Sequence, residues 1–330
     1  MLFYHLRVFA AATRPIGHLR IEFVMDVNIP QQVVNALWLG GLYSLFALGY
    51  ALIFSVLGLL NLSHSAVFVW GAFIGLYSAC GDQVLTSTCT ELQRPIWVAV
   101  PMAMIGAGVI SVLVDRVAFW PLRRRGAPRM NQLISSIGAS VLLVSLAQIV
   151  FGAAQKRFPI GSISTDPIDN LPVIVTPIQI AVLIIAVVLM LLLRLLVINT
   201  RTGRAMRTVA FRDRVASLLG VNVDAIYMLA FFISGALAGA AGMLYGLAFN
   251  SMTPFMGESV ALKGLTVIVL GGLGSIEGAV LGGFLVAGIE VFSVALGQSD
   301  MRDAVVFLSL FLILLVRPQG LLGQRVDDRA

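Results

Sequence analysis

The chain has 330 residues, of which 59% are hydrophobic and only 12% are charged, whereas a soluble domain keeps about a quarter of its residues charged. With a mean hydropathy of +0.97, this composition excludes a water-soluble globule, a disordered chain and a disulfide-rich secreted module. The net charge of +6 comes from arginines between apolar runs, so it indicates membrane topology and no nucleic-acid partner. We expect an all-α, polytopic transmembrane bundle, surrounded by membrane lipid, with about eight or nine membrane segments.

Residues 1–30 are expected to form an extension that precedes the membrane domain. Strict counting of the crossings puts this extension outside, although it contains arginines that the positive-inside rule would keep in the cytoplasm. Met25 offers a later start for the chain. Residues 1–24 are therefore interpreted either as an upstream extension of the reading frame or as a flexible cytoplasmic tail.

A long uncharged stretch follows. The 55 residues between Asp26 and Asp82 contain no Asp, Glu, Lys or Arg, and one helix of that length would be far too long for a bilayer of about 30 Å. The polar run 61–65 divides the stretch into helices near 33–59 and 65–80. Because irregular backbone at membrane depth survives only beside protein or a water-filled cavity, three residues of this break are candidates for a substrate path: Asn61, Ser63 and His64.

Two cysteines flank the next loop, residues 81–95, which we place outside the membrane. In that compartment Cys80 and Cys89 could form a disulfide, and the alternative is two unpaired thiols. Two cysteines alone do not make a zinc or iron–sulfur site.

Four further spans occupy the middle of the chain, and two arginine-rich loops separate them. The loops 116–129 and 201–214 should both lie in the cytoplasm by the positive-inside rule, which places 81–95 and 155–176 outside. The spans are 96–114, 132–154, 177–198 and 225–249.

The second arginine-rich loop continues into apolar residues. Leu218 and Leu219 are out of place on a purely solvated loop, and an apolar patch rimmed by charge is typical of a docking surface. We therefore predict one amphipathic helix over 201–220 that contacts a soluble partner. The alternative is a loop that only satisfies topology.

The C-terminal third is less regular. We expect a short or re-entrant helix over 258–275, a crossing over 278–297, a last segment from about 300 to 316 and a tail over 323–330. Clustered glycines interrupt the first pair, so this region is predicted to line the path, with three candidate residues: Gly271, Gly272 and Gly274.

Few ionisable residues fall at membrane depth. Lys263 is a candidate for gating or substrate contact, the alternatives being an interfacial position and a structural ion pair. For Glu290 a structural hydrogen bond is favoured over contact with substrate. Glu258 and Glu277 lie nearer to segment ends, where we expect them to be solvated. Glycines spaced four apart, such as Gly71 and Gly75, are expected to pack helices closely.

No catalytic motif is present. The glycine-rich run 271–275 lacks the lysine of a phosphate-binding loop, and His64 is the only histidine beyond residue 24, so neither a histidine-based zinc site nor a Ser-His-Asp triad is expected. We predict a transporter without a cofactor, and no enzyme. An ion-coupled secondary transporter is the alternative class, although such a transporter is expected to have inverted repeats and a carboxylate relay.

Several motifs, in order, identify a family. The chain resembles the permease subunits of branched-chain amino acid ABC importers over residues 31–322. The matching pieces are Asn61-Leu62-Ser63-His64, Leu133-Ile134-Ser135-Ser136-Ile137-Gly138, Arg201-Thr202-Gly203-Arg204-Ala205, Ala216-Ser217-Leu218-Leu219-Gly220, Leu270-Gly271-Gly272-Leu273-Gly274-Ser275-Ile276 and Arg317-Pro318-Gln319-Gly320-Leu321.

The resemblance implies a bacterial inner-membrane importer with ATP-binding cassette subunits, a second permease subunit and a periplasmic substrate-binding protein. It also implies that 201–220 is the segment that couples the permease to the ATPase, and that its contacts are made by Arg204, Arg207, Ala216, Leu219 and Gly220. Relatives of the family carry urea, short amides or aromatic acids, and these substrates stay open beside branched-chain amino acids.

Overall fold

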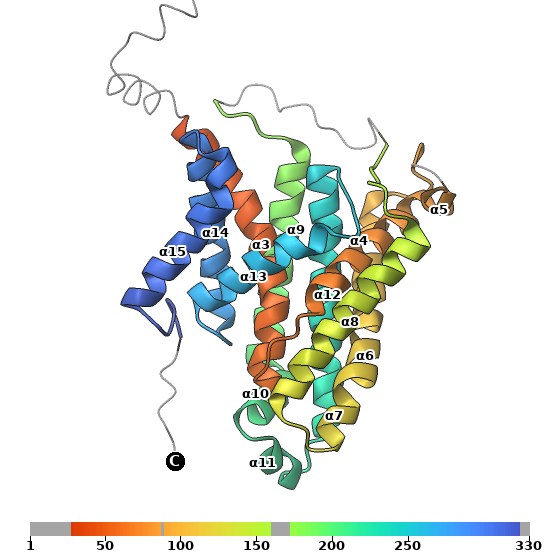
Figure 1. Ribbon diagram of the computed structural model, residues 1–330, viewed down its shortest axis with the longest axis vertical. Helices are drawn as coiled ribbons and strands as arrows, with labels where there is room; N and C mark the ends of the chain where they lie inside the picture. Colours follow the sequence, from red (N-terminus) through yellow and green to blue (C-terminus); the bar gives the residue numbers. More distant parts are fainter. Residues whose placement is uncertain (1–27, 87–88, 160–171, 324–330) are drawn as a thin grey trace, which may run out of the picture.

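The computed structural model describes residues 28–86, 89–159 and 172–323. Within these ranges the regular elements are helices and no strand is formed (Figure 1), which confirms the expected fold class. The predicted N-terminal extension up to residue 27, with Met25, and residues 324–330 of the predicted tail lie outside the described residues.

Six described helices have the length and apolarity to cross a membrane. One of them is a continuous unit made of α6 (Ile96–Val114), η1 (Asp115–Phe119) and α7 (Trp120–Arg124). The others are α3 (Ile29–Leu57), α8 (Arg129–Phe151), α9 (Pro177–Asn199), α12 (Val223–Phe249) and α14 (Ile276–Ala295).

Three of the predicted segments form shorter helices. These are α4 (His64–Cys80), α13 (Met256–Gly271) and α15 (Arg302–Val316), with 17, 16 and 15 residues, whereas a crossing needs about 20. The expected count of eight or nine segments is therefore not confirmed. The 3-10 turn η2 (Ser299–Met301) leads into α15.

Helices α3 and α12 form the centre of the bundle, and α3 is enclosed by protein along most of its length. It packs against α14, α12, α9 and α13, while α12 also packs against α6 and α4. Gly71 of α4 faces Gly239 of α12 so closely that a Cβ atom at Gly71 would overlap the Gly239 backbone. Small residues thus let these helices touch in lipid, as the glycine spacing predicts.

The prediction that 116–129 is a loop is wrong for residues 116–124, because the chain remains helical as far as Arg124. A π-helical stretch, η1, widens the helix at this point, and Ser135 of α8 donates a hydrogen bond to the carbonyl oxygen of Ala118 at 2.9 Å. Arg123 also pairs with the buried carboxylate of Asp115 at 2.7 Å. These contacts allow basic residues to continue the helix instead of ending it.

The prediction of a single helix over 201–220 is also wrong. The segment forms two helices, α10 (Arg201–Phe211) and α11 (Asp213–Leu218). Arg212 separates them because its backbone is extended, with φ −156° and ψ 109°.

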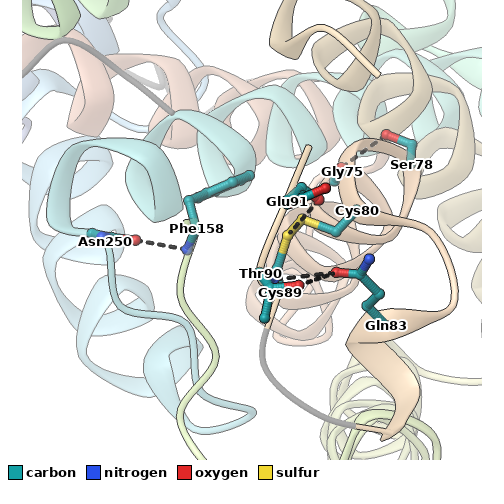
Figure 2. Close-up of a disulfide and its surroundings, with 9 residues drawn as sticks. All are labelled: Gly75, Ser78, Cys80, Gln83, Cys89, Thr90, Glu91, Phe158 and Asn250. Atoms are coloured by element: carbon teal, nitrogen blue, oxygen red, sulfur yellow. Dashed lines mark hydrogen bonds between the residues drawn. A yellow bond between two sulfur atoms is a disulfide. The ribbon is translucent and has the colours of Figure 1, made fainter. Parts of the chain in front are cut away.

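The two ends of the bundle differ, as predicted. Helices α7, α10 and α11 gather at one end, and α5 (Gln83–Thr86) lies at the other (Figure 1). At the α5 end, Cys80 and Cys89 form a disulfide (Figure 2), so of the two alternatives left by the sequence the bridge is the one formed. Gln83 Oε1 accepts hydrogen bonds from the backbone N–H and the hydroxyl of Thr90, both at 3.1 Å.

The turn after α12 returns the chain toward the bundle interior. Asn250 adopts a left-handed conformation with φ 44°, and its Oδ1 accepts a hydrogen bond from the Phe158 N–H at 2.8 Å (Figure 2). Lys156 and Met252 exchange backbone hydrogen bonds beside it. This local pairing anchors the segment that leads into α13.

Candidate functional site: two helix N-termini inside the membrane domain

Helix α4 begins directly after a local turn made by the predicted break. Asn61 Oδ1 accepts hydrogen bonds from the N–H and the hydroxyl of Ser63, at 3.2 and 2.6 Å, and the Asn61 carbonyl accepts the His64 N–H at 3.1 Å. Such a turn satisfies backbone groups locally, which lets a helix start without continuing the previous one. Asn61 and Ser63 therefore fix where α4 begins.

His64 shows at what depth this start lies. Its Nδ1 is 3.2 Å from Ser234 Oγ, near the middle of α12, and its Nε2 is 3.2 Å from the Phe46 carbonyl oxygen in α3. The ring is fully buried and also packs against the Tyr50 ring, with centroids 4.5 Å apart. Because α3 and α12 run the length of the bundle, α4 begins at middle depth.

Helix α13 begins at the same depth. A Cβ atom at Gly257, in its first turn, would lie only 2.7 Å from the Ser65 carbonyl oxygen of α4. The two helix N-termini therefore touch each other. A residue larger than glycine at position 257 would push them apart.

A cavity of about 250 Å³ opens beside this contact, between α4, α8 and α13. Its apolar lining includes Val141, Val144 and Phe255, and Ser65 and Ala66 contribute from the first turn of α4. The remaining polar lining comes from the second half of α8 and from the start of α13: Ser140, Ser145, Gln148 and Glu258.

The first-turn amides beside the cavity are unpaired. Within the described residues, the backbone N–H groups of Ser65, Ala66 and Gly257 have no backbone acceptor. All three residues are buried. The first N–H groups of a helix lack intrahelical partners and carry its positive dipole end, so they favour an anion.

Lys263 belongs to a different cluster, which is buried except for Asp303. Its Nζ lies 2.5 Å from Glu290 Oε1, 3.3 Å from Asp303 Oδ1 and 3.2 Å from the Tyr43 hydroxyl. Tyr43 in turn donates to Glu290 Oε2 at 2.8 Å. These side chains come from α13, α14, α15 and α3, so the cluster joins four helices, and Glu290 makes the hydrogen bond that the sequence favours for it.

The glycine-rich break after α13 is packed against the end of the chain. Gly272 has a φ of 108°, and a Cβ there would meet the backbone of Gly323. The carbonyls of Leu270 and Gly271 accept the N–H groups of Leu321 and Leu322 at 2.8 and 2.9 Å. The break predicted at this place is confirmed, and its carbonyl groups are satisfied by protein.

The seven candidate path residues thus do not form one site. Asn61, Ser63 and His64 shape the start of α4 next to the cavity, while Lys263 and the glycine break lie in two other places. Sequence reasoning missed the polar residues of α8, although their signal is present as serine and glutamine within an apolar span. It placed Glu258 near a solvated segment end, and the structure has this residue exposed in the first turn of α13.

At the opposite end, α10 is amphipathic, as predicted for the start of 201–220. Gly203, Met206 and Val209 are buried at a spacing of three, and α10 packs through them on α9, α3 and α12. Arg204 and Arg207 are exposed. This helix therefore presents a basic face outward.

The residues of α11 and its end divide between interior and surface. Ala216 is fully buried, whereas Leu218 and Leu219 are 86% and 70% exposed. Gly220 follows with a φ of 81°, and a Cβ there would have no atom within 4 Å. An apolar, exposed tip therefore projects beyond the basic face of α10.

Comparison with known proteins gives a consistent set of relatives. A sequence model of the family described as "Branched-chain amino acid transport system / permease component" matches residues 32–316. No solved structure matches the chain.

The curated relatives are permease components of transporters. The chain is 32% identical to the high-affinity branched-chain amino acid transport system permease protein LivH of Salmonella typhimurium, over 89% of this chain and 95% of that protein. It is 33% identical, with the same two coverages, to the permease protein BraD of the corresponding system of Pseudomonas aeruginosa. A probable branched-chain amino acid transport permease protein LivH of Methanocaldococcus jannaschii is 25% identical over 90% of this chain and 94% of that protein.

Proposed function

The chain belongs to the family of permease components of branched-chain amino acid transport systems, and from this premise we propose that it is the membrane-spanning subunit of an ATP-driven importer for branched-chain amino acids. It is a multi-pass membrane protein with six apolar helices long enough to cross a bilayer. Its relatives are transporter components, and not enzymes, by name.

The observation that carries the ATP-driven part is the tip formed by α11 and the residues after it. Leu218 and Leu219 are among the most exposed leucines of the described chain, at the end of the bundle that holds the arginine-rich segments (Figure 1). A leucine pair exposed beyond the membrane domain suits a protein partner better than water. In this proposal the tip seats in an ATP-binding cassette subunit, and Arg204 and Arg207 border the contact.

The remaining partners follow from the same proposal. A second permease subunit completes the path, and a periplasmic substrate-binding protein delivers the amino acid at the disulfide-bearing end. The location would be the inner membrane of a bacterium. ATP binding would move α10 and α11 and, through their packing on α9 and α12, shift the irregular starts of α4 and α13 between outward-open and inward-open arrangements.

One observation favours the alternative class, an ion-coupled secondary transporter. Glu290 and Asp303 both contact Lys263 in the membrane domain, and such carboxylates serve as proton relays in some transporters. The energy source of uptake separates the two classes. Urea, short amides and aromatic acids are tested as competing substrates in the same assay.

The experiment uses the tagged chain expressed with its transporter genes. The proposal expects an ATPase subunit to co-purify, and expects leucine uptake by whole vesicles to survive an uncoupler and to stop with vanadate. Uptake that follows an ion gradient and ignores vanadate would establish the alternative class instead.

A further inference from the structure

A charged side chain is exposed at the middle of the membrane domain. Glu258 lies in the first turn of α13, which touches the first turn of α4, and His64 places that turn at the level of the middle of α12. A carboxylate at this depth faces a water-filled cavity or protein, since exposure to lipid is costly. The face formed by α4, α8 and α13 is therefore covered by water or by another protein subunit and not by lipid.

The cavity on this face is lined both by groups that favour an anion and by a group that favours a cation. The unpaired N–H groups of Ser65 and Ala66 favour an anion. A buried backbone donor without a partner is rare in proteins, so these amides call for a ligand or water. Glu258, which lines the same cavity, favours a cation. A ligand that satisfies both carries one charge of each sign close together.

The remaining lining residues indicate what the uncharged part of such a ligand looks like. Val141, Val144 and Phe255 supply apolar contacts, which suit an aliphatic side chain. Ser140, Ser145 and Gln148 add hydrogen-bonding groups on the α8 side. A cavity of about 250 Å³ is small, and accordingly it fits a small solute and no peptide.

We propose that this cavity is a half-site for an aliphatic α-amino acid. The α-carboxylate binds the N–H groups of Ser65 and Ala66, the α-ammonium binds the Glu258 carboxylate, and the side chain lies against Val141 and Val144. The assignment rests on the proposed transport function and deepens it, because it disfavours two substrate classes: urea and short amides have neither charge. An aromatic acid without an amino group would leave Glu258 unpaired.

If Glu258 only stabilises its own helix, the transport measurements will give a different result. An acidic residue in the first turn stabilises any helix through its dipole, and Glu277 occupies the same kind of position in α14, with a side chain 60% exposed. Glu277→Gln is therefore a matched control for Glu258→Gln. If only the dipole matters, the two variants will transport alike.

The first test measures ATP-driven leucine uptake by the complete, reconstituted transporter at a leucine concentration below saturation. Glu258→Gln should lower uptake about tenfold or more, as expected for the loss of a charged hydrogen bond, while Glu277→Gln should transport at the wild-type level. Equal uptake by wild type and Glu258→Gln would overturn the half-site. Wild-type complex that transports no amino acid would refute the proposed function itself, so the two failures are distinguishable.

The second test does not depend on how well Glu258→Gln assembles. The only two cysteines of the chain form the disulfide, so Ser145→Cys introduces a single free thiol into the cavity, and Leu142→Cys places one nearby on α8. A membrane-impermeant thiol reagent should label Ser145→Cys much faster than Leu142→Cys in the complete transporter, and leucine delivered by the binding protein should slow that labelling. Equal rates for both variants, or no protection by leucine, would overturn the proposal.

Discussion

Lys263 is held in place by charge. It is 8% exposed and contacts the carboxylates of Glu290 and Asp303, and Tyr43 closes the cluster by hydrogen bonds to both Lys263 and Glu290. Buried ion pairs add little net stability compared with apolar residues, but losing one partner leaves an uncompensated charge. The arrangement therefore fixes the positions of α3, α13, α14 and α15 relative to one another.

Removing one partner of the Lys263–Glu290 pair should lower the stability of the protein strongly, and removing both charges should lower it less. Lys263→Met should destabilise the purified protein by about 3–5 kcal/mol, and Glu290→Gln in the same chain should restore part of that loss because the stranded carboxylate is gone. Thermal unfolding in detergent of the two single variants and the double variant measures the coupling. If Lys263→Met unfolds like wild type but transports poorly, Lys263 contacts the substrate, and the structural reading is wrong.

At the same scale, the sequence indicates which residues are unusual but not which of them meet. His64, the only histidine beyond residue 24, and Lys263 are visible as exceptions in apolar runs. The cavity next to Glu258 is not visible, because it depends on a contact between Gly257 and Ser65, which are far apart along the chain. That three polar residues of α8 line this cavity is also visible only in the tertiary structure.

At the scale of elements, the helix breaks are the most informative feature. Two of them, at 61–63 and after Gly271, are recognisable from polar and glycine clusters. The break at Arg212 is not, because nothing in its residue type opposes a helix. The continuation of α6 through η1 and α7 also escapes prediction, since it relies on a hydrogen bond from Ser135 of α8 and on the ion pair between Asp115 and Arg123 within the same helical unit.

The break after α13 depends on backbone geometry at Gly272. Gly272→Ala should destabilise the protein by roughly 1–2 kcal/mol or more because of the positive φ, and further because the new Cβ meets Gly323. Gly288 in α14 has open space around its Cβ position, so Gly288→Ala is the matched control and should be neutral or slightly stabilising. Equal unfolding temperatures for both variants would show that the break tolerates ordinary residues.

The tip after α11 should behave as an interface element. Leu219 is 70% exposed, so Leu219→Asp should leave the unfolding temperature unchanged. It should nevertheless weaken ATPase binding by about 2 kcal/mol or more if the residue is a hot spot. Leu219→Met keeps the apolar contact and should retain binding. Co-purification of the ATPase with each variant gives the comparison, and full retention by Leu219→Asp would remove this residue from the interface.

At the scale of the whole molecule, the bundle has two chemically distinct ends. The arginine-rich helices α7 and α10 lie at one end, together with α11, and the disulfide lies near the other (Figure 1). Disulfides persist in oxidising compartments and basic segments stay in the cytoplasm, so both features indicate the same orientation. An importer fuelled by cytoplasmic ATP requires that orientation.

The decisive measurement is therefore on which side of the membrane the α11 end lies. Leu219→Cys provides a single free thiol, because the two native cysteines form the disulfide, and a membrane-impermeant maleimide is applied to spheroplasts and to inside-out vesicles. We expect labelling in inside-out vesicles and none in intact spheroplasts. Labelling of Leu219→Cys from outside intact spheroplasts would contradict it, because no cytoplasmic ATPase could then reach this end.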